Sequence, residues 1–334
     1  MNSSRNGILA GGNFIVDHVK IIDHYPAQDM LASILEQTQS NGGGPYNVLK
    51  DLAAMQAPFP LSAAGMVGED DNGRWIQEDC RSREIDVSQL HATKERSTSY
   101  TDAMTVSGTG RRTFFHQRGA NALFDVHHVD FSQSTARIFH LGYLMLLDTM
   151  DSFAEDGRTR AAHLLEKAQA AGLETSVDMV STEHPQFREI ALSALPHTDH
   201  LMINESEASR VLHRPLAAND TPALLEAARE LLELGVHQTV TLHTEHGCVS
   251  ITKDGATATQ LSLQLPSGYS KGATGAGDAF AAGLLYGLHE GFPLAERLKL
   301  AVCTAAASLS DPTPSAGLRP VAECLELGEK FGCR

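Results

Sequence analysis

The alternation of short apolar runs with helix-like segments constrains this chain more than any other feature. From about residue 136 onward, apolar runs at residues 138–141 and 200–203 each come before a segment of helical periodicity, at 158–171 and 205–212. This order is typical of strand–helix–strand units, whose strands pair in parallel. We therefore predict an α/β fold, doubly wound, with a mostly parallel sheet and helices on both faces.

Two stretches interrupt this rhythm, at roughly residues 14–40 and 93–119. In the second, strand-like segments at 99–101 and 112–115 flank the turn residues 107–110, as in a hairpin. We expect both stretches to form a small antiparallel β-lid. No internal repeat, low-complexity tract or Pro/Gly/Ser-rich linker separates two modules, so we expect the lid to be an insertion in one domain that takes in all 334 residues.

The balance of charge bears on possible partners. The chain carries 26 Lys and Arg against 41 Asp and Glu, a formal net charge of −15, and it has no run of basic residues. Such a chain is poorly suited to neutralise a phosphate backbone. This argues against nucleic acid and against anionic membrane surfaces as partners.

The cysteines and the N-terminal segment bear on location. The five cysteines are scattered without CxxC spacing, and their odd number indicates reduced thiols. Residues 1–6 run into a short apolar stretch at 7–10, which is too brief for a signal peptide or a membrane span. We expect a soluble, cytoplasmic protein.

A glycine-rich segment is the strongest candidate for chemistry. It follows a strand-like run at 261–265, precedes a helix predicted at 279–288, and reads Gly272-Ala273-Thr274-Gly275-Ala276-Gly277-Asp278. Glycines let the backbone approach a ligand, and the free N–H groups of a first helical turn attract anions. Phosphoryl transfer also needs a carboxylate to accept the proton of the attacking hydroxyl, a role that suits Asp278. Alternatively, Asp278 only complements the helix dipole and the glycines only permit close helix packing.

The segment from Thr274 to Phe280 resembles the signature of the PfkB carbohydrate kinases, the ribokinase family. The resemblance implies that Asp278 is the catalytic base and that the amides around it form an anion hole, contributed by Gly275, Ala276 and Gly277. Further motifs in the same order extend the resemblance from Gly12 to about Pro320. It implies a doubly wound α/β sandwich with a β-lid, which binds ATP and Mg²⁺.

Two further motifs concern the substrate. The first strand of the family carries an Asp that holds substrate hydroxyls, and Asp17 matches it; alternatively, Asp17 is an ordinary surface residue. Residues 41–47 resemble the family's other signature, which implies that Gly42, Gly43 and Asn47 contact the sugar. Two bare amides and one carboxamide suit hydroxyl recognition. Alternatively, this segment is only a turn that leads into a helix.

Residues 204–207 match the family's NxxE motif. The resemblance implies that Asn204 and Glu207 organise the metal-bound triphosphate, with Glu207 acting on Mg²⁺ through water. Mg²⁺ usually keeps several waters in proteins, which agrees with such indirect ligation. Alternatively, the segment is an ordinary helix start with Asn204 as its cap.

Residues 241–247 resemble the family's nucleotide-side loop. The ATP-binding residues that the resemblance implies are Asn204, Thr241, His243, Gly247 and Thr274. His243 stands where the family usually has glycine, so its imidazole either contacts the nucleotide or faces solvent. His243 and His246 lack a third ligand at a suitable spacing, which argues against a metal pair.

Two positions depart from the family pattern. Gly272 stands where the signature usually begins with Asp, a carboxylate that in many members helps to hold an activating monovalent cation. This argues against potassium dependence. In the C-terminal part, residues 308–317 contain Pro312 and Pro314 where relatives often carry a cation-binding loop, and the two segments do not align clearly.

The lid stretch at residues 111–122 looks like that of sugar-kinase members, which implies substrate contacts from Arg118 and Asn121. Alternatively, its arginines are exposed strand residues. Tyr143 follows the strand predicted at 138–141, so it belongs to the carboxyl edge of the sheet, where ligands bind. A packing role is the alternative for Tyr143.

We therefore predict an ATP-dependent carbohydrate kinase that phosphorylates a hydroxyl of a ribose-, fructose- or keto-sugar-like molecule, with Asp278 as general base. A nucleoside kinase, which needs a stacking slot for a base, is one alternative. A non-catalytic sugar- or nucleotide-binding regulator is the other, motivated by Gly272 and His243. The resemblance also implies a possible homodimer through the lid. The sequence identifies neither the sugar nor the hydroxyl.

Overall fold

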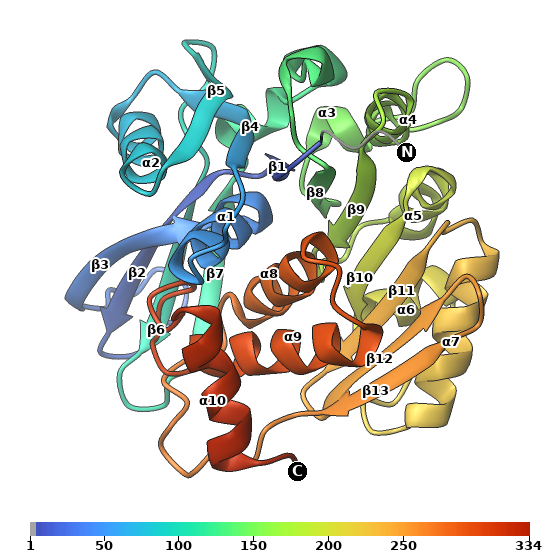
Figure 1. Ribbon diagram of the computed structural model, residues 1–334. Helices are drawn as coiled ribbons and strands as arrows, with labels where there is room; N and C mark the ends of the chain where they lie inside the picture. The colour runs from blue at the N-terminus through green and yellow to red at the C-terminus, as the bar shows by residue number, and fades with distance from the viewer. Residues whose placement is uncertain (1–4) are drawn as a thin grey trace.

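The structure is a computed structural model that describes residues 5–334, and its centre is a nine-stranded sheet in the order β13-β12-β11-β10-β9-β8-β1-β4-β5 (Figure 1). The strands from β11 to β5 in that order run parallel. Their bounds are Thr239–Thr244 (β11), His200–Asn204 (β10), Glu174–Met179 (β9), Ile138–Leu144 (β8), Ile8–Gly12 (β1), Leu61–Gly68 (β4) and Ile85–Thr93 (β5). The predicted mostly parallel sheet is confirmed.

One edge of this sheet is antiparallel. It consists of β12, Gly247–Thr252, and β13, Thr257–Leu261, which follow β11 as a meander. The strand predicted at residues 261–265 is therefore wrong, because β13 ends where that run begins. The chain turns toward the C-terminus there, and the amide of Gln264 donates to the carbonyl of Gly332 (3.0 Å) instead of a neighbouring strand.

Helices cover both faces of the large sheet, as predicted (Figure 1). One face carries α1 (Gly44–Ala54), α2 (Asp71–Ser82), α8 (Ala276–His289), α9 (Leu294–Ser308) and α10 (Val321–Phe331). The other carries α3 (Asp148–Asp151), α4 (Arg160–Ala170), α5 (Phe187–Ala194), α6 (Glu205–Leu212) and α7 (Thr221–Glu233). Short 3₁₀ helices span Gly119–Leu123, Val126–His128, Phe131–Gln133 and Leu195–His197.

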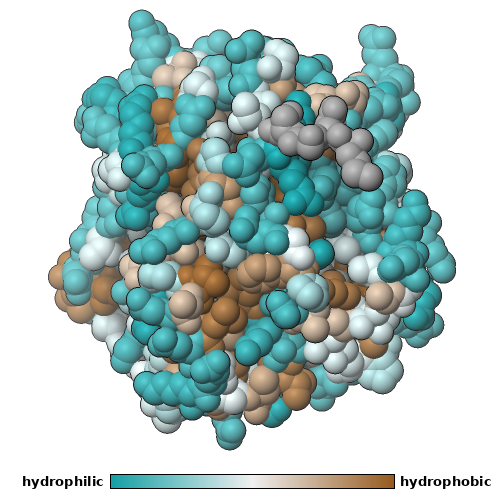
Figure 2. All heavy atoms as spheres, viewed as in Figure 1, coloured by the Kyte–Doolittle hydropathy of each residue, from teal (hydrophilic) through white to brown (hydrophobic). Residues whose placement is uncertain are grey.

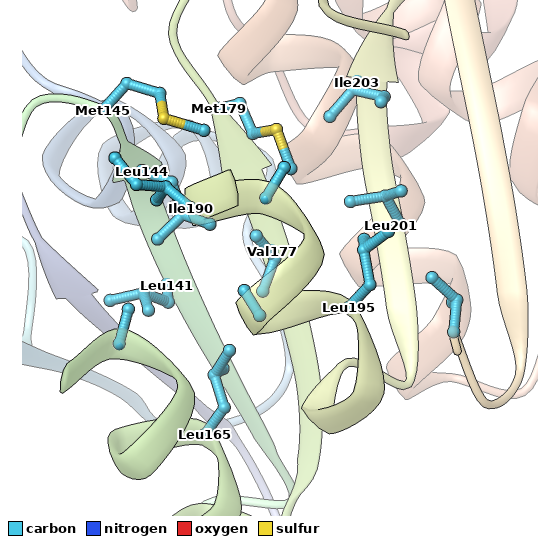
Figure 3. Close-up of a cluster of buried hydrophobic side chains, with 14 of the residues drawn as sticks. Leu141, Leu144, Met145, Leu165, Val177, Met179, Ile190, Leu195, Leu201 and Ile203 are labelled. Carbon is cyan, nitrogen blue, oxygen red and sulfur yellow. The ribbon is translucent and has the colours of Figure 1, made fainter. Parts of the chain in front are cut away.

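Each face of the sheet has its own apolar core. In the core under α4 and α5, Val177 of β9 and Leu201 of β10 pack toward Ile190 of α5 (Figure 3). These side chains are at most 1% exposed. Because parallel strands are covered on both faces, they are apolar on both, and this accounts for the short apolar runs in the sequence.

The lid is a separate four-stranded sheet in the order β3-β2-β6-β7. Its bounds are Ile15–Ile22 (β2), Ile34–Gly42 (β3), Tyr100–Val106 (β6) and Arg112–Gln117 (β7). The pairs β2–β3 and β6–β7 are antiparallel hairpins, but β2 and β6 run parallel where the hairpins meet. The first six residues of β3 are exposed and its last three are buried, so only the inner end of the lid enters the body of the protein.

No helix within residues 5–334 is both long enough and apolar enough to cross a membrane. Residues 1–4 of the N-terminal segment considered above lie outside the described residues.

Candidate active site

The glycine-rich segment forms the start of α8. Gly275 is the N-cap residue, with φ at 79°, and the helix begins at Ala276. A Cβ added to Gly275 would lie 2.5 Å from the Cβ of Pro314, so both the left-handed backbone and the neighbouring loop require glycine here. Unpaired N–H groups and the helix dipole make the first turn of a helix like α8 a site for an anion.

Asp278 lies in this first turn and is only 4% exposed. Its Oδ1 accepts a hydrogen bond from the Tyr143 hydroxyl (2.5 Å), and its Oδ2 accepts one from Nδ2 of Asn47 (2.7 Å). Burial raises the pKa of the Asp278 carboxyl to about 6, while the two hydrogen bonds oppose that rise. The carboxylate is therefore ionised at neutral pH, with a pKa close enough to neutrality for a general base.

A small cavity of about 180 Å³ opens beside Asp278, at the carboxyl ends of β8, β9, β10 and β11. Its lining brings together Tyr143, Asp178, Ser181, Asn204, Glu207, His243, Gly275, Gly277 and Asp278. Ligands of open α/β sheets bind at this edge. The structure thus collects several of the predicted site residues around one space.

Two of the lining carboxylates, Asp178 and Glu207, are buried next to each other. Burial and the charge of Glu207 raise the pKa of Asp178 well above its ordinary value. Burial raises the pKa of Glu207 to about 7, although the backbone amide and side chain of Asn204 and the Ser181 hydroxyl donate to it. Two buried carboxylates that line one cavity repel each other when both are ionised, and a cation in that cavity would relieve the repulsion.

Asp17 approaches the same centre from the lid strand β2. Burial raises the pKa of its carboxyl to about 7, a hydrogen bond from Thr101 opposes this, and the charge of Asp278 adds to the rise. A Cβ on Gly42 would lie 2.5 Å from Oδ1 of Asp17, so glycine there leaves room for the carboxylate. Gly43 has φ at 88° and packs on the carbonyl of Asn13.

Asn13, which the sequence reading missed, fixes Tyr143. Its Oδ1 accepts from the backbone N–H of Tyr143 (2.6 Å), and its Nδ2 donates to the carbonyl of Leu146 (3.1 Å). The Tyr143 ring also packs on Gly44, where a Cβ would lie 2.8 Å from its Cε1. Tyr143 therefore has both a packing role and a hydroxyl that contacts Asp278.

A second, larger cleft of about 790 Å³ lies on the other side of the α8 N-terminus. Its lining includes Asn204, His243, Gly247, Phe280 and Ala305. Apolar walls with a few polar groups, next to an anion site, suit an elongated ligand with a flat apolar end and an anionic end. Its polar groups include Asn204, which caps α6 by accepting from the backbone N–H of Glu207 (2.9 Å).

His243 lines both cavities and is partly buried. Burial lowers the pKa of its imidazole to about 4, so the ring is neutral. The ring centroid lies 4.9 Å from that of Phe280. His243 therefore supplies a flat, uncharged surface in the wall between the two cavities. In the part of the chain that the structure describes, no group of three or more His, Cys, Asp or Glu could hold a metal directly.

Three of the residues predicted to bind ligands have other partners. Thr241 is buried within β11, where its hydroxyl bonds to that of Ser250 (2.9 Å), so it does not reach the cleft. Asn121 is fully buried and its carboxamide holds both backbone groups of Phe14. Arg118 forms an ion pair with Asp148 (2.8 Å). The structure gives Thr241 and Asn121 structural roles in place of the predicted ligand contacts.

Arg112, not Arg118, connects the lid to the glycine-rich loop. Its guanidinium donates to the hydroxyl of Thr274, and a Cβ on Gly272 would lie 2.9 Å from its Nη2. Sequence spacing gave no reason to prefer one lid arginine over another. Asp178 could have been found, because it ends an apolar parallel strand, where side chains reach the ligand edge.

The family model described as pfkB family carbohydrate kinase matches residues 12–320. Among solved structures, ribokinase from Arabidopsis thaliana, complexed with ribose and ATP, has a TM-score of 0.80 at 20% identity and covers 97% of this chain and 98% of its own. The nucleoside kinase of Methanocaldococcus jannaschii has a TM-score of 0.76 at 19% identity, with coverage of 97% and 98%.

A curated relative from Halopiger xanaduensis is similar over a shorter stretch. This protein, named ATP-dependent ribose-1-phosphate kinase, is 33% identical over 92 residues, which is 28% of this chain and 30% of the relative. The three relatives carry names for three different acceptors. The comparisons therefore agree on the fold and differ on the acceptor.

Proposed function

This chain belongs to the pfkB family of carbohydrate kinases and is an ATP-dependent carbohydrate kinase, and we propose that it phosphorylates a hydroxyl of a neutral sugar of the ribose, fructose or keto-sugar class. One observation carries the proposal: a buried carboxylate, Asp278, is held by Asn47 and Tyr143 at the N-terminus of α8, beside a cavity. A base and an anion site thus share one helical turn.

Asp278 is the general base in this proposal. Its carboxylate accepts the proton as the substrate oxygen attacks the γ-phosphoryl group. The hydrogen bonds from Asn47 and Tyr143 fix the carboxylate before the reaction and keep it ionised. Positioning of this kind accounts for much of the catalysis in phosphoryl transfer.

The N–H groups at the start of α8 and the guanidinium of Arg112 stabilise negative charge on the transferred group. Gly275, Ala276 and Gly277 have no side chain larger than a methyl group, and the amides of Gly275 and Gly277 can donate to the anion, whereas that of Ala276 also donates to the carbonyl of Ala273 (3.3 Å). Arg112 lies against Thr274 at the same loop. Because Arg112 belongs to the lid strand β7, its charge stabilises the transferred group only while the lid holds Arg112 against Thr274.

ATP fits the larger cleft, with its base on the apolar side near Phe280 and its phosphates toward the α8 N-terminus. Mg²⁺ would suit the acidic pair of Asp178 and Glu207, since a divalent cation would offset the burial and the mutual repulsion that raise the pKa values of these two carboxyls. When bound, the ion neutralises charge on the phosphates. We propose that Glu207 contacts it through water, with Asn204 fixing the Glu207 side chain. Gly272 supplies no carboxylate for a monovalent cation.

The charge of the small cavity favours a neutral acceptor. Asp278 lines it, Asp17 lies nearby, and its lining contains no Lys or Arg that would offset these two carboxylates, whereas Mg²⁺ would offset Asp178 and Glu207. Carboxylates accept hydrogen bonds from hydroxyl groups but repel a phosphate. This supports an unphosphorylated sugar over a sugar phosphate.

We also propose a homodimer through the lid, in a cytoplasmic protein. The lid exposes large apolar side chains, among them Leu31, Ile34 and Leu35 at or near β3 and Phe114 and Phe115 on β7. In Figure 2, hydrophobic residues gather at the left margin, where Figure 1 has β2 and β3. Exposed apolar surface of this kind marks an interface. The cytoplasmic location is based on the scattered thiols of the sequence.

The test is ADP release with Mg·ATP across a panel of neutral pentoses, hexoses and keto-sugars, with sugar phosphates and nucleosides as comparison. We expect acceptor-dependent ADP release with a neutral sugar, and a new phosphate ester in the product. Turnover confined to sugar phosphates or nucleosides would contradict the substrate class. Tight binding of sugar or nucleotide with no turnover of any acceptor would contradict the kinase mechanism and favour a regulator.

A further inference from the structure

A buried polar chain links the lid strand β3 to Asp278. It begins at Asn41, near the end of β3, which is 3% exposed and lies opposite Val16 in the lid pairing. Nδ2 of Asn41 donates to Oδ1 of Asn47 (2.7 Å) and to Oγ of Ser315 (2.9 Å). Nδ2 of Asn47 in turn donates to Oδ2 of Asp278 (2.7 Å).

The number of hydrogens on Asn41 fixes the direction of this chain. A carboxamide NH₂ group has two hydrogens and accepts no hydrogen bond. Asn41 uses one for Asn47 and one for Ser315, so the atom of Asn47 that faces Asn41 must be its oxygen. The NH₂ group of Asn47 is thereby turned toward Asp278.

The opposite orientation of Asn47 would disfavour the ionised base. With its carboxamide turned over, the Asn47 oxygen would face Oδ2 of Asp278, and two lone-pair groups would meet in a buried site. Loss of a donor to a buried carboxylate, and its replacement by an acceptor, favours protonation of that carboxylate. Among the described residues, the Asn47 carboxamide has two side-chain partners, the NH₂ group of Asn41 and the carboxylate of Asp278, and both favour the same orientation as long as Asp278 is ionised.

We propose that Asn41 is a positioning residue of the kinase reaction, which orients the Asn47 carboxamide so that it donates to Asp278 and keeps that base ionised. The proposal rests on the proposed role of Asp278 as the base. Asn41 touches neither cavity, so it acts only through Asn47. Because Asn41 belongs to a lid strand, the same bond ties the inner end of the lid to the base.

Several other groups influence the protonation of Asp278 and must stay unchanged in a test. Those that face it or share its cavity are Tyr143 on β8, Asp17 on β2, Asp178 on β9, Glu207 on α6, His243 on β11 and Asp51 on α1. None of them contacts the Asn41 carboxamide directly. A change at Asn41 therefore reaches Asp278 through Asn47.

The test is the pH dependence of kcat/KM for Asn41→Asp, Asn41→Leu and Ser315→Ala. An ionised Asp at this position accepts hydrogen bonds only, so it would turn the NH₂ group of Asn47 toward itself and away from Asp278, and its charge would add to the shift. We expect the acid limb of Asn41→Asp to move up by about one pH unit, the change that loss of one charge-assisted bond produces. We expect a smaller upward shift for Asn41→Leu, which adds no charge and in which only Asp278 itself still favours the donor orientation of Asn47. Ser315→Ala keeps the Asn41–Asn47 bond and should leave the limb in place.

A purely structural role for Asn41 gives a different result. It would lower the melting temperature and reduce kcat equally at every pH, with no movement of the acid limb in folded variants, and that outcome would overturn the proposal. Asp278→Asn is assayed in parallel to separate the two hypotheses. If it retains full activity, the base assignment fails; if it is inactive while both Asn41 variants keep the wild-type limb, only the Asn41 proposal fails.

Discussion

The carboxyl edge of the large sheet and the lid place their side chains in opposite ways. At the sheet edge, the carboxylates of Asp178, Glu207 and Asp278 are at most 7% exposed. On the lid, Leu35 and Phe114 are 59% and 56% exposed. Buried charge and exposed apolar surface both cost free energy in an isolated protein. The body thus holds charges that a substrate and a cation would balance, while the lid holds surface that a second chain would cover.

This comparison predicts different phenotypes for the two regions. Substitutions at the sheet edge should act on the chemical step, because the reacting groups are already positioned there. On the lid, a substitution of Arg112, which contacts the glycine-rich loop, should reduce the stabilisation of negative charge. A substitution of the exposed apolar residues should weaken assembly. The predictions below test this division, in order of decreasing effect.

Asp278→Asn should reduce kcat by about 10³-fold, because a carboxamide cannot accept the substrate proton. The fold should be retained, since the Asn side chain has the same shape, although its single oxygen can accept from only one of the two donors, Tyr143 and Asn47. The measurement is steady-state turnover with the best acceptor, with circular dichroism as the check on folding. A variant with wild-type kcat would show that another group takes the proton.

Arg112→Ala should reduce kcat by roughly 10- to 100-fold, because the lid then supplies no positive charge beside Thr274. The neighbouring Arg111→Ala is the matched control, since Arg111 is exposed and should leave kcat unchanged. Arg112→Lys should restore part of the loss, as the charge returns without the guanidinium geometry. Equal effects of the Arg111 and Arg112 variants would mean that only the overall charge of the lid matters.

The activity of the wild type should fall as pH decreases through about 6. The pKa of Asp278 is raised to about 6, so the carboxylate is ionised above that pH and protonated below it. A base that must be ionised gives an acid limb on which kcat/KM drops about tenfold per pH unit. If kcat/KM instead began to fall only near the ordinary pKa of an exposed carboxyl, the result would contradict the buried environment assigned to Asp278.

Asp51→Asn should stabilise the protein at neutral pH and not at low pH. Asp51 is fully buried in α1, its oxygens lack a hydrogen-bond partner of normal geometry, and burial raises its pKa well above the ordinary value. Between the unfolded and folded pKa values, unfolding releases a proton, so wild-type stability falls with rising pH by up to about 1.4 kcal/mol per unit. The Asn side chain has no such proton to release, so the stability of Asp51→Asn should not fall with rising pH for this reason.

The measurement is urea unfolding of wild type and Asp51→Asn across the acidic and neutral range. The exposed Asp29→Asn serves as control and should show no pH-dependent difference from wild type. A difference between Asp51→Asn and wild type that stays constant with pH would mean that Asp51 is ionised to the same extent in the folded and unfolded states.

The smallest effect on catalysis is expected for the exposed lid face. Leu35→Ser with Phe114→Ser should convert a dimer to a monomer while kcat changes less than about twofold, because both side chains are exposed and neither lines a cavity of the site. Molar mass by light scattering is the readout. Phe153→Ser, an exposed aromatic outside the lid, is the control. A wild-type monomer at micromolar concentration would contradict the lid dimer.

Most of the fold followed from local patterns in the sequence. The helix predicted at 205–212 coincides with α6, because Asn204 and Glu207 form a capping box that fixes its start. The prediction of a strand at 261–265 was wrong, because an apolar stretch does not reveal which segment it pairs with. Here backbone hydrogen bonds of this run, such as that of Gln264, go to the C-terminal segment and not to a strand of the sheet.

The candidate site was predictable only in part. The Gly275–Asp278 turn could be inferred because glycine, helix start and carboxylate are adjacent in sequence. The contacts of Asp278 could not, since Asn47 and Tyr143 are 231 and 135 residues away along the chain. For the same reason, Thr241 and Asn121 looked like ligand contacts although their polar groups bond within the fold.

The sequence by itself determined the sheet class and the position of the glycine-rich helix start, and it led to the proposal that Asp278 is the base, because each depends on residues close together in the chain. Tertiary structure alone decided that Arg112 reaches the loop, that Asp178 joins Glu207, and that Asn41 orients Asn47. The physical reason is that hydrogen bonds and pKa values depend on distance and burial in space, and these are set only when distant segments pack together.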